Sequence, residues 1–229
     1  MGFRTLALET SGECCGVCLA EGKNILVEHC IRGRHLQSRL LAVMVSGVVG
    51  EAGLSLTDLS GIAISAGPGS FTGLRVGMGY AKGLAYGLEL PLVAVPTLTV
   101  LASQLPFTRF PICPLLDAGR GLVYGGLYRW KGLSLVQEDR FRPVNPGALM
   151  EGIKEKTIFM GDGAVRFRED LEGGLKEQAL FVPSSLNYPR PSTVAVLGGG
   201  KLHTGEGRDI DRLEPLYMLD FPAPVKSVE

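Results

Sequence analysis

The residues best suited to chemistry stand in one segment, ISAGPGSFTGLRVG, which spans residues 64–77. A hydrophobic strand is predicted to end at the turn Gly67–Gly69, because glycine adopts backbone conformations closed to other residues and proline cannot continue a strand. Ser70 or Thr72 can then cap a helix that opens at Gly73, by accepting hydrogen bonds from its free backbone amides. A strand, a glycine turn and a helix N-terminus together can bind an anion, and the same segment is also typical of a turn that only caps its helix.

Sulfur chemistry is the second candidate, because three cysteines follow the pattern Cys-Cys-x-x-Cys. The chain has five cysteines, Cys14, Cys15, Cys18, Cys30 and Cys113. Such spacing occurs in metal and redox sites, but a zinc site needs a fourth ligand and the chain has only three histidines. Adjacent residues of a strand also point to opposite faces, which separates the first two thiols. We therefore expect reduced, structural thiols and no metal site.

Composition limits the classes of function that are open to the chain. The 229 residues allow one domain or two small ones, and a hydrophobic fraction of 45% is ample for a core. Lys plus Arg balance Asp plus Glu at 23 each, so we expect no broad basic surface that would hold a nucleic acid by its phosphates. The N-terminus leads directly into a strand pattern, and the longest apolar stretch, 40–50, is too short to span a bilayer. These features predict a soluble, cytoplasmic protein.

The elements that must position these residues follow a mixed α/β pattern. In the first half, three strands in antiparallel hairpins precede a helix, a strand, the glycine turn, a second helix, a further strand and a short helix. Their expected bounds are 5–10, 16–21, 24–30, 36–52, 61–66, 73–88, 91–95 and 97–104. A proline-flanked stretch near residue 105 predicts a boundary between a lobe of residues 1–106 and a lobe of residues 107–229.

The second half opens as the first does, which is what a duplicated fold would produce. Strands are expected first, then a helix, a strand, a helix, a short strand and a last helix. Their expected bounds are 112–117, 122–130, 134–141, 147–155, 157–160, 164–171, 180–183 and 193–203. The final residues, 221–229, contain two prolines and are expected to be loose.

Two helices of the first half carry more apolar or small residues than one buried face requires. After Arg39 the helix over 36–50 is apolar on nearly every side, whereas a surface helix should be polar opposite the core. Two rows of glycines spaced by four run along different faces of the next helix, one starting at Gly73 and the other at Gly79. Each glycine costs about 1 kcal/mol relative to alanine, so we expect a second backbone to approach closely. The predicted partner interface comprises Leu36, Leu40, Val43, Met44, Gly47, Gly73, Gly77, Gly79, Tyr80, Gly83 and Gly87.

The sequence resembles the TsaB (YeaZ) family, a small subunit of the bacterial machinery that makes threonylcarbamoyladenosine in tRNA. The string GPGSFTGLRVG at 67–77 is similar to the family hallmark residue for residue. The loop carried by this string consists of Gly67, Pro68, Gly69, Ser70, Phe71 and Thr72, with Arg75 following. Four further stretches are similar to the family: LALETSGECCGVCLAEG, HLQSRLLAVM from His35, LLDAGRGLVYGGLY from Leu115 and LEPLYM from Leu213. Residues 137–191 match only loosely.

The resemblance implies the two-lobed fold of actin, hexokinase and Hsp70 (the ASKHA fold), with a mixed sheet and crossover helices in each lobe and a reduced second lobe. It implies pairing through the N-terminal helices, either with the catalytic subunit TsaD or, in its absence, with a second copy of the chain. A small ATPase, TsaE, would join the heterodimer. The expected role is a non-catalytic scaffold that holds a TsaD-like subunit active, with tRNA contacted only indirectly and no membrane contact.

A nucleotide-binding enzyme is the first alternative to the scaffold. ASKHA kinases and ATPases hold metal and water with an acid at the end of the first strand, where Glu9, Thr10 and Ser11 stand, and Asp117 has the corresponding place in the second half. The family more often has Asp at the first position, and Arg120 departs from the glycine pair that the second phosphate loop needs. We therefore expect a vestigial nucleotide site, no cofactor in the isolated chain, and ATP or ADP only at the partner interface.

A peptidase-like protein that uses Ser70 is the second alternative. Ser70 lacks the Gly-x-Ser-x-Gly elbow, and His203 is the distant candidate for its base. The related catalytic subunits bind metal through His-x-x-x-His, whereas here His35 is followed by Arg39 at the fourth position. One imidazole alone does not make a metal site, so none is predicted at this helix start.

Overall fold

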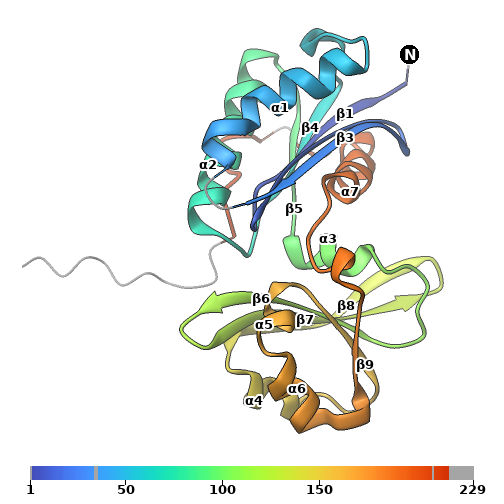
Figure 1. The fold of residues 1–229 in the computed structure, drawn as a ribbon. Coiled ribbons are helices and arrows are strands. Elements are labelled where there is room, and N and C mark those ends of the chain that lie inside the picture. The colour runs from blue at the N-terminus through green and yellow to red at the C-terminus, as the bar shows by residue number, and fades with distance from the viewer. Residues whose placement is uncertain (1, 34–35, 208, 217–229) are drawn as a thin grey trace, which may run out of the picture.

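The computed structural model describes residues 2–33, 36–207 and 209–216, and its two lobes are each built on a five-stranded sheet (Figure 1). The first sheet has the order β3-β2-β1-β4-β5, in which β1 is antiparallel to β2 and parallel to β4. β2 and β3 are antiparallel, and β4 and β5 are parallel. The strands are β1 (Arg4–Glu9), β2 (Cys14–Glu21), β3 (Asn24–Arg32), β4 (Gly61–Ser65) and β5 (Leu92–Val95).

The second sheet repeats the first in order and direction. Its order is β10-β9-β6-β7-β8, with β6 antiparallel to β7 and parallel to β9. The predicted duplication of a mixed sheet is therefore confirmed. The strands are β6 (Ile112–Gly119), β7 (Leu122–Lys131), β8 (Ser134–Val144), β9 (Thr157–Met160) and β10 (Ala179–Phe181).

The helices also follow the predicted order. They are α1 (Gln37–Glu51), α2 (Phe71–Gly87), α3 (Thr97–Ser103), α4 (Pro146–Glu151), α5 (Asp162–Arg166), α6 (Arg168–Leu175) and α7 (Pro191–His203), with short 3-10 turns η1 (Leu56–Asp58), η2 (Lys176–Gln178) and η3 (Ser184–Leu186). The single helix expected over 164–171 is two helices, because the chain leaves helical geometry at Phe167. None of the helices in the described ranges is long and apolar enough to cross a membrane.

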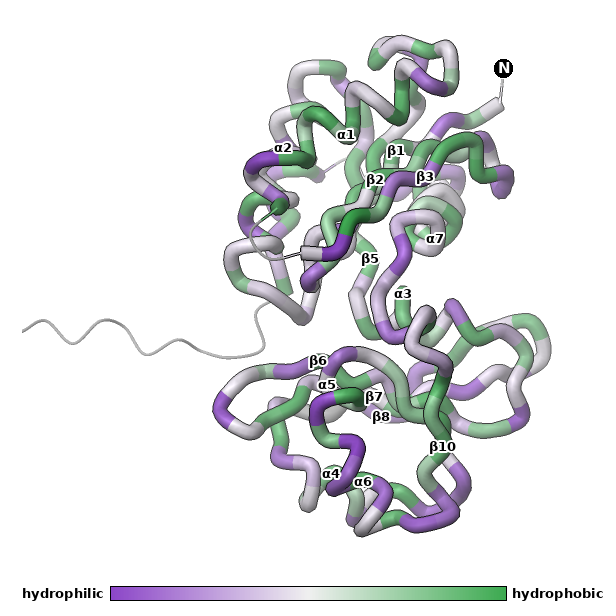
Figure 2. Tube along the Cα trace, in the orientation of Figure 1, coloured by the Kyte–Doolittle hydropathy of each residue, from purple (hydrophilic) through white to green (hydrophobic). Residues whose placement is uncertain are grey.

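Helices cover both faces of the first sheet, α1 and α2 on one side and α7 on the other (Figure 1). Successive strand residues point to opposite faces, so Leu6 and Leu8 lie in the core under α1 and α2, while Ala7 lies in the core under α7. Figure 2 shows hydrophobic residues along α1 and along the strands that it covers. This arrangement buries one apolar side of α1 and leaves the opposite side exposed or half-buried.

The position of α7 corrects the predicted domain boundary. Although α7 lies within 107–229, it packs on β1, β2 and β4 of the first lobe. The α7 face of the sheet carries small side chains, and a Cβ atom on Gly198 would lie 2.2 Å from the Cβ of Ala63. Gly198 therefore lets the helix approach the sheet closely. The first lobe consists of residues up to about 106 together with α7 and the described residues that follow it, of which Gly207 and Leu216 bond to Leu92 and Ala66.

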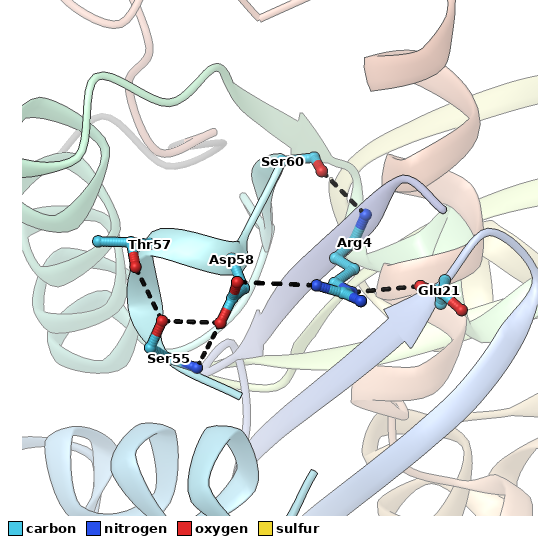
Figure 3. Close-up of polar contacts among 6 residues, drawn as sticks. All are labelled: Arg4, Glu21, Ser55, Thr57, Asp58 and Ser60. Carbon is cyan, nitrogen blue, oxygen red and sulfur yellow. Dashed lines mark hydrogen bonds and ion pairs between the residues drawn. The ribbon is translucent and has the colours of Figure 1, made fainter. Parts of the chain in front are cut away.

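A polar cluster fixes the end of the first sheet that lies away from the glycine turn (Figure 3). The side chain of Arg4 bonds to Glu21 at 3.2 Å and lies 3.9 Å from Asp58, and its backbone amide donates to Ser60. Asp58 in turn accepts from the backbone amide and hydroxyl of Ser55, at the start of η1. The cluster ties β1 to β2 and to the turn before β4, which fixes the register that brings the opposite strand ends together.

Candidate functional site

The turn Gly67–Gly69 is bonded to the end of β1. The amide of Ser70 donates to the carbonyl of Ser11 at 2.6 Å, and a Cβ on Gly69 would lie 2.1 Å from the same oxygen. Gly67 has φ +105°, which disfavours any side chain there, and it exchanges hydrogen bonds with Thr97. Two glycines are thus required for the turn to reach this position. Of the two predicted caps, Ser70 is the one used, because its hydroxyl accepts from the amide of Gly73, and the helix begins at Phe71, two residues before the expected start.

The first glycine row of α2 packs inside the chain. A Cβ on Gly73 would lie 2.1 Å from the carbonyl oxygen of Thr10, and one on Gly77 would lie 2.0 Å from the Thr10 hydroxyl oxygen. The prediction that Gly73 and Gly77 belong to a partner surface is therefore wrong, because their missing side chains let α2 lie directly on the end of β1. Met44 of α1 is corrected in the same way: it is 5% exposed and belongs to the core.

The second glycine row remains open. Apart from chain neighbours and the backbone of α2 itself, no atom of the described residues lies within 4 Å of a Cβ placed on Gly79, Gly83 or Gly87. On the neighbouring helix α1, Val43 is 68% exposed. We define the helical face as these positions together with the half-buried residues beside them, namely Leu36, Leu40, Val43 and Gly47 of α1 and Gly79, Tyr80, Gly83 and Gly87 of α2. It is a surface of apolar and small residues with a strip of exposed backbone.

The strand ends of the two lobes enclose a cavity of about 400 Å³, here called the interlobe cleft. Its described lining residues are Ser11, Gly12, Glu13, Gly33, Gln37, Gly69, Ser70, Thr72, Gly73, Leu116, Asp117 and Asp162. Three of these are acidic, and none of the lining residues that the structure describes is Lys or Arg. Asp117 is paired with Arg166, and Glu13 with Arg32 at 3.1 Å. Two of the three acidic side chains thus have arginine partners, which leaves Asp162 as the acidic lining residue without an ion pair among the described residues.

Asp162 is the most deeply placed acid among the cleft residues that sequence reasoning missed, which also include Gly12, Glu13, Gly33, Gln37 and Leu116. It begins α5, and its carboxylate accepts from the amide of Asp117 at 3.0 Å. Burial raises the pKa of its carboxyl group. A Cβ on Gly161 would lie 2.1 Å from the carbonyl oxygen of Leu115, so this turn meets β6 as the Gly67–Gly69 turn meets β1. The signal was the sequence Gly-Asp-Gly directly after a strand, at the place that duplicates Gly-Pro-Gly.

Only two of the four residues expected at a vestigial nucleotide site line the cleft. Ser11 and Asp117 line the cleft, whereas Glu9 is fully buried and does not. One carboxylate oxygen of Glu9 accepts from the amide of Ser11 at 2.7 Å and from its hydroxyl, and the other has no hydrogen-bond partner among the described residues. Burial raises the pKa of Glu9 to about 7. Thr10 is buried beneath α2, so Glu9 and Thr10 support the helix and do not reach the cavity.

Ser70 does not stand in a hydrolytic arrangement with His203. Ser70 lies against Ser11, beyond the last residue of β1, whereas the His203 ring packs edge-on against Phe3, before the first residue of that strand. The intervening strand separates the two side chains by about 25 Å at roughly 3.3 Å per residue. His29 is bonded to Glu51, and His35 lies outside the described residues. No group of three or more His, Cys, Asp or Glu within the described part of the chain could hold a metal ion.

Known proteins resemble this chain in sequence and in fold. A family model described as TsaD, tRNA N6-adenosine threonylcarbamoyltransferase, matches residues 32–208. The chain is 31% identical to the tRNA threonylcarbamoyladenosine biosynthesis protein TsaB of Bacillus subtilis, over 98% of this chain and 97% of that protein. The chain belongs to the TsaB family. A second TsaB protein, from Escherichia coli, is 38% identical over 131 residues, which are 56% of this chain and 55% of that protein.

The structure agrees with this family. YeaZ from Pseudomonas aeruginosa superposes with a TM-score of 0.77 at 27% identity, covering 94% of this chain and 99% of that chain. The resemblance drawn from the GPGSFTGLRVG string is thereby confirmed, as is the two-lobed ASKHA fold that it implied. As a TsaB-family protein, the chain serves in the biosynthesis of threonylcarbamoyladenosine in tRNA.

Proposed function

We propose that this TsaB-family chain is a non-catalytic subunit that binds a TsaD-type catalytic subunit through the helical face and holds it in its active state. The observation that carries the proposal is the open glycine row of Gly79, Gly83 and Gly87. In an exposed helix each glycine costs about 1 kcal/mol relative to alanine. No atom of the described residues lies where the missing side chains would be, so we attribute the benefit of the row to another molecule.

The kind of partner follows from the shape of the face. A strip of helix backbone without Cβ atoms allows a second helix to approach more closely than larger side chains would permit. The apolar residues beside the strip, including Val43 and Tyr80, supply surface whose burial drives association. A TsaD-type subunit shares the family model with this chain, so it can offer a related pair of N-terminal helices.

The proposal extends to the other components. The acidic interlobe cleft supports the expectation that the isolated chain holds no ATP or ADP, so a nucleotide would be held only where the two subunits meet. A TsaE-like ATPase would join that pair, and a second copy of this chain would occupy the helical face when the catalytic subunit is absent. The balanced net charge supports an indirect role toward tRNA, in the cytoplasm.

Two leucine substitutions test the proposal as a matched pair. Gly83→Leu fills the open strip on α2, and Gly173→Leu adds the same side chain to α6 of the second lobe, where a Cβ also meets no atom within 4 Å. Each full-length variant is mixed with the TsaD-type subunit of the same organism and passed over a size-exclusion column. Gly83→Leu should elute separately from the catalytic subunit while Gly173→Leu co-elutes. Co-elution of both variants at wild-type amounts rules out the proposed interface.

A further inference from the structure

Two cysteines meet on the α7 side of the first sheet. In the β2–β3 ladder Cys14 pairs with Arg32 and Gly16 pairs with Cys30, so Cys14 and Cys30 share one face and are diagonal neighbours. Gly16 has no side chain, and the ring of Pro191 packs over it, since a Cβ there would lie 2.9 Å from the Pro191 Cγ. The two thiols lie close enough for each to shift the pKa of the other. Nothing about this contact is needed for pairing, because the helical face lies on the other side of the sheet.

The two thiols differ in access. Cys30 is exposed on the edge strand β3, whereas Cys14 is 4% exposed. The neighbouring Cys14 thiol lowers the pKa of Cys30, and the positive charge of Arg190 lowers it further. The pKa of Cys14 is raised by the neighbouring Cys30 and by burial. The exposed sulfur is thus the nucleophile, and the buried sulfur is placed to react second.

One arginine and two carboxylates act on the exposed sulfur of Cys30. Glu28 on the same strand holds Arg190 at 2.7 Å, which fixes the guanidinium near Cys30. The carboxylates of Glu28 and Glu9 oppose ionisation of Cys30, and Arg190 favours it. Arg32 acts on Cys14 by lowering its pKa, and is itself paired with Glu13.

The other cysteines serve as internal comparisons. Cys15 lies in the core under α1 and Cys18 in the core under α7, and both are fully buried. Cys113 is fully buried in the second lobe. Burial is the main reason that the pKa of Cys15 is raised to about 11 and that of Cys18 to about 12. These three thiols are therefore unreactive at neutral pH.

We propose that Cys30 and Cys14 form a thiol-modification site that takes a small disulfide, such as glutathione disulfide, and converts it into an internal disulfide bond. The Cys30 thiolate attacks one sulfur of the small disulfide, which forms a mixed disulfide and releases the first small thiolate. Cys14 then gives up its proton and attacks the Cys30 sulfur, which releases the second small thiolate. Two protein thiols are oxidised, the small disulfide is reduced to two thiols, and the two protons pass to the departing sulfurs.

The fold allows the second bond to close. Diagonal neighbours in a sheet are about 7–8 Å apart between Cα atoms, and disulfides favour about 4–7 Å, so β3 must move slightly toward Cys14. β3 is an edge strand held in the sheet only by β2, and the ladder between them already has an irregularity at Leu19/Ala20. A movement of β3 therefore disturbs only one strand pairing.

Intact-mass spectrometry and peptide mapping under non-reducing conditions test the proposal on the reduced full-length protein incubated with glutathione disulfide. The wild-type chain should lose the mass of two hydrogen atoms and give a Cys14–Cys30 crosslinked peptide. Cys14→Ser should stop at a glutathione adduct on Cys30, and Cys30→Ser should give neither product. Cys18→Ala, a change on the same strand and face, should behave as wild type, and near-UV circular dichroism of each variant verifies its fold.

Three results overturn the proposal. They are a wild-type chain that stays reduced, a wild-type chain that stops at the Cys30 adduct, and a Cys30→Ser chain that forms a crosslink or adduct as fast as wild type. Because the readout is a covalent mass change in the isolated chain, it is independent of any loss or retention of pairing with a TsaD-type subunit.

Discussion

Replacement of glycine by alanine should have opposite effects on stability in the two glycine rows of α2: Gly73→Ala should lower the free energy of unfolding, and Gly83→Ala should raise it. At Gly73 the new Cβ would lie 2.1 Å from the carbonyl oxygen of Thr10, a backbone atom that cannot rotate away. Overpacking of this kind costs about 1–3 kcal/mol, and the upper end applies because backbone must move. The gain in helix propensity is at most about 1 kcal/mol, so Gly73→Ala should lose about 2 kcal/mol of unfolding free energy.

In Gly83→Ala the new Cβ contacts no atom of the described residues outside its own helix. Only the gain in helix propensity remains, which adds about 1 kcal/mol to the free energy of unfolding. For a chain of this size, 1 kcal/mol shifts the melting temperature by roughly 2–4 °C. The two variants should therefore differ by about 6–12 °C in melting temperature, with wild type between them. Thermal and urea unfolding followed by far-UV circular dichroism give the values. Equal shifts, or a stabilised Gly73→Ala chain, refute the assignment of one row to the core and the other to open surface.

Three further predictions concern the sheet, the buried acid and the cleft. Gly198→Ala places a Cβ 2.2 Å from that of Ala63, so it should lower the melting temperature by several degrees, while Gly200→Ala, which meets no atom, should not. The pKa of Glu9 is raised from 4.5 to about 7, so the folded state binds the Glu9 proton more tightly than the unfolded state does. The protonated side chain therefore adds to the free energy of unfolding below pH 4.5, and this stabilisation is lost as the pH rises through about 7. Glu9→Gln should remove that decline, up to about 3 kcal/mol in urea titrations across this range, and an unchanged pH profile would contradict the buried carboxyl. Isothermal titration of the isolated chain with magnesium ATP should give no binding heat, and saturable binding abolished by Asp117→Asn would restore the nucleotide-enzyme alternative.

Much of the fold could be predicted because hydrophobic alternation and glycine punctuation are local signals. The strands of both sheets lie close to their expected bounds, and Ser70 caps α2 as the residue pattern indicated. The position of α7 could not be predicted, since it depends on contact between Gly198 and Ala63, which are far apart in the sequence. A helix with little polar surface in the second half gives no indication of which sheet it will cover.

The candidate site could be predicted only in part, because its contacts also depend on residues far apart in the sequence. Both glycine rows of α2 have the same spacing, and only the three-dimensional contact with Thr10 distinguishes the inward row from the open one. Met44 and Val43 are equally apolar neighbours, yet the rotation of α1 buries the first and exposes the second. Asp162 was missed because its role comes from duplication of the fold, which brings the Gly161 turn against β6.

The most direct test of the account is the dissociation constant between the full-length chain and the TsaD-type subunit of its organism, measured for wild type, Gly83→Leu and Gly173→Leu. Disruption of a central contact should weaken binding of Gly83→Leu about 100-fold, equivalent to about 3 kcal/mol, with wild-type affinity for Gly173→Leu. Formation of threonylcarbamoyladenosine in tRNA by the reconstituted mixture should fall with the loss of binding. Equal dissociation constants for the three chains would contradict the claim that the open glycine row of α2 is the surface on which the catalytic subunit docks.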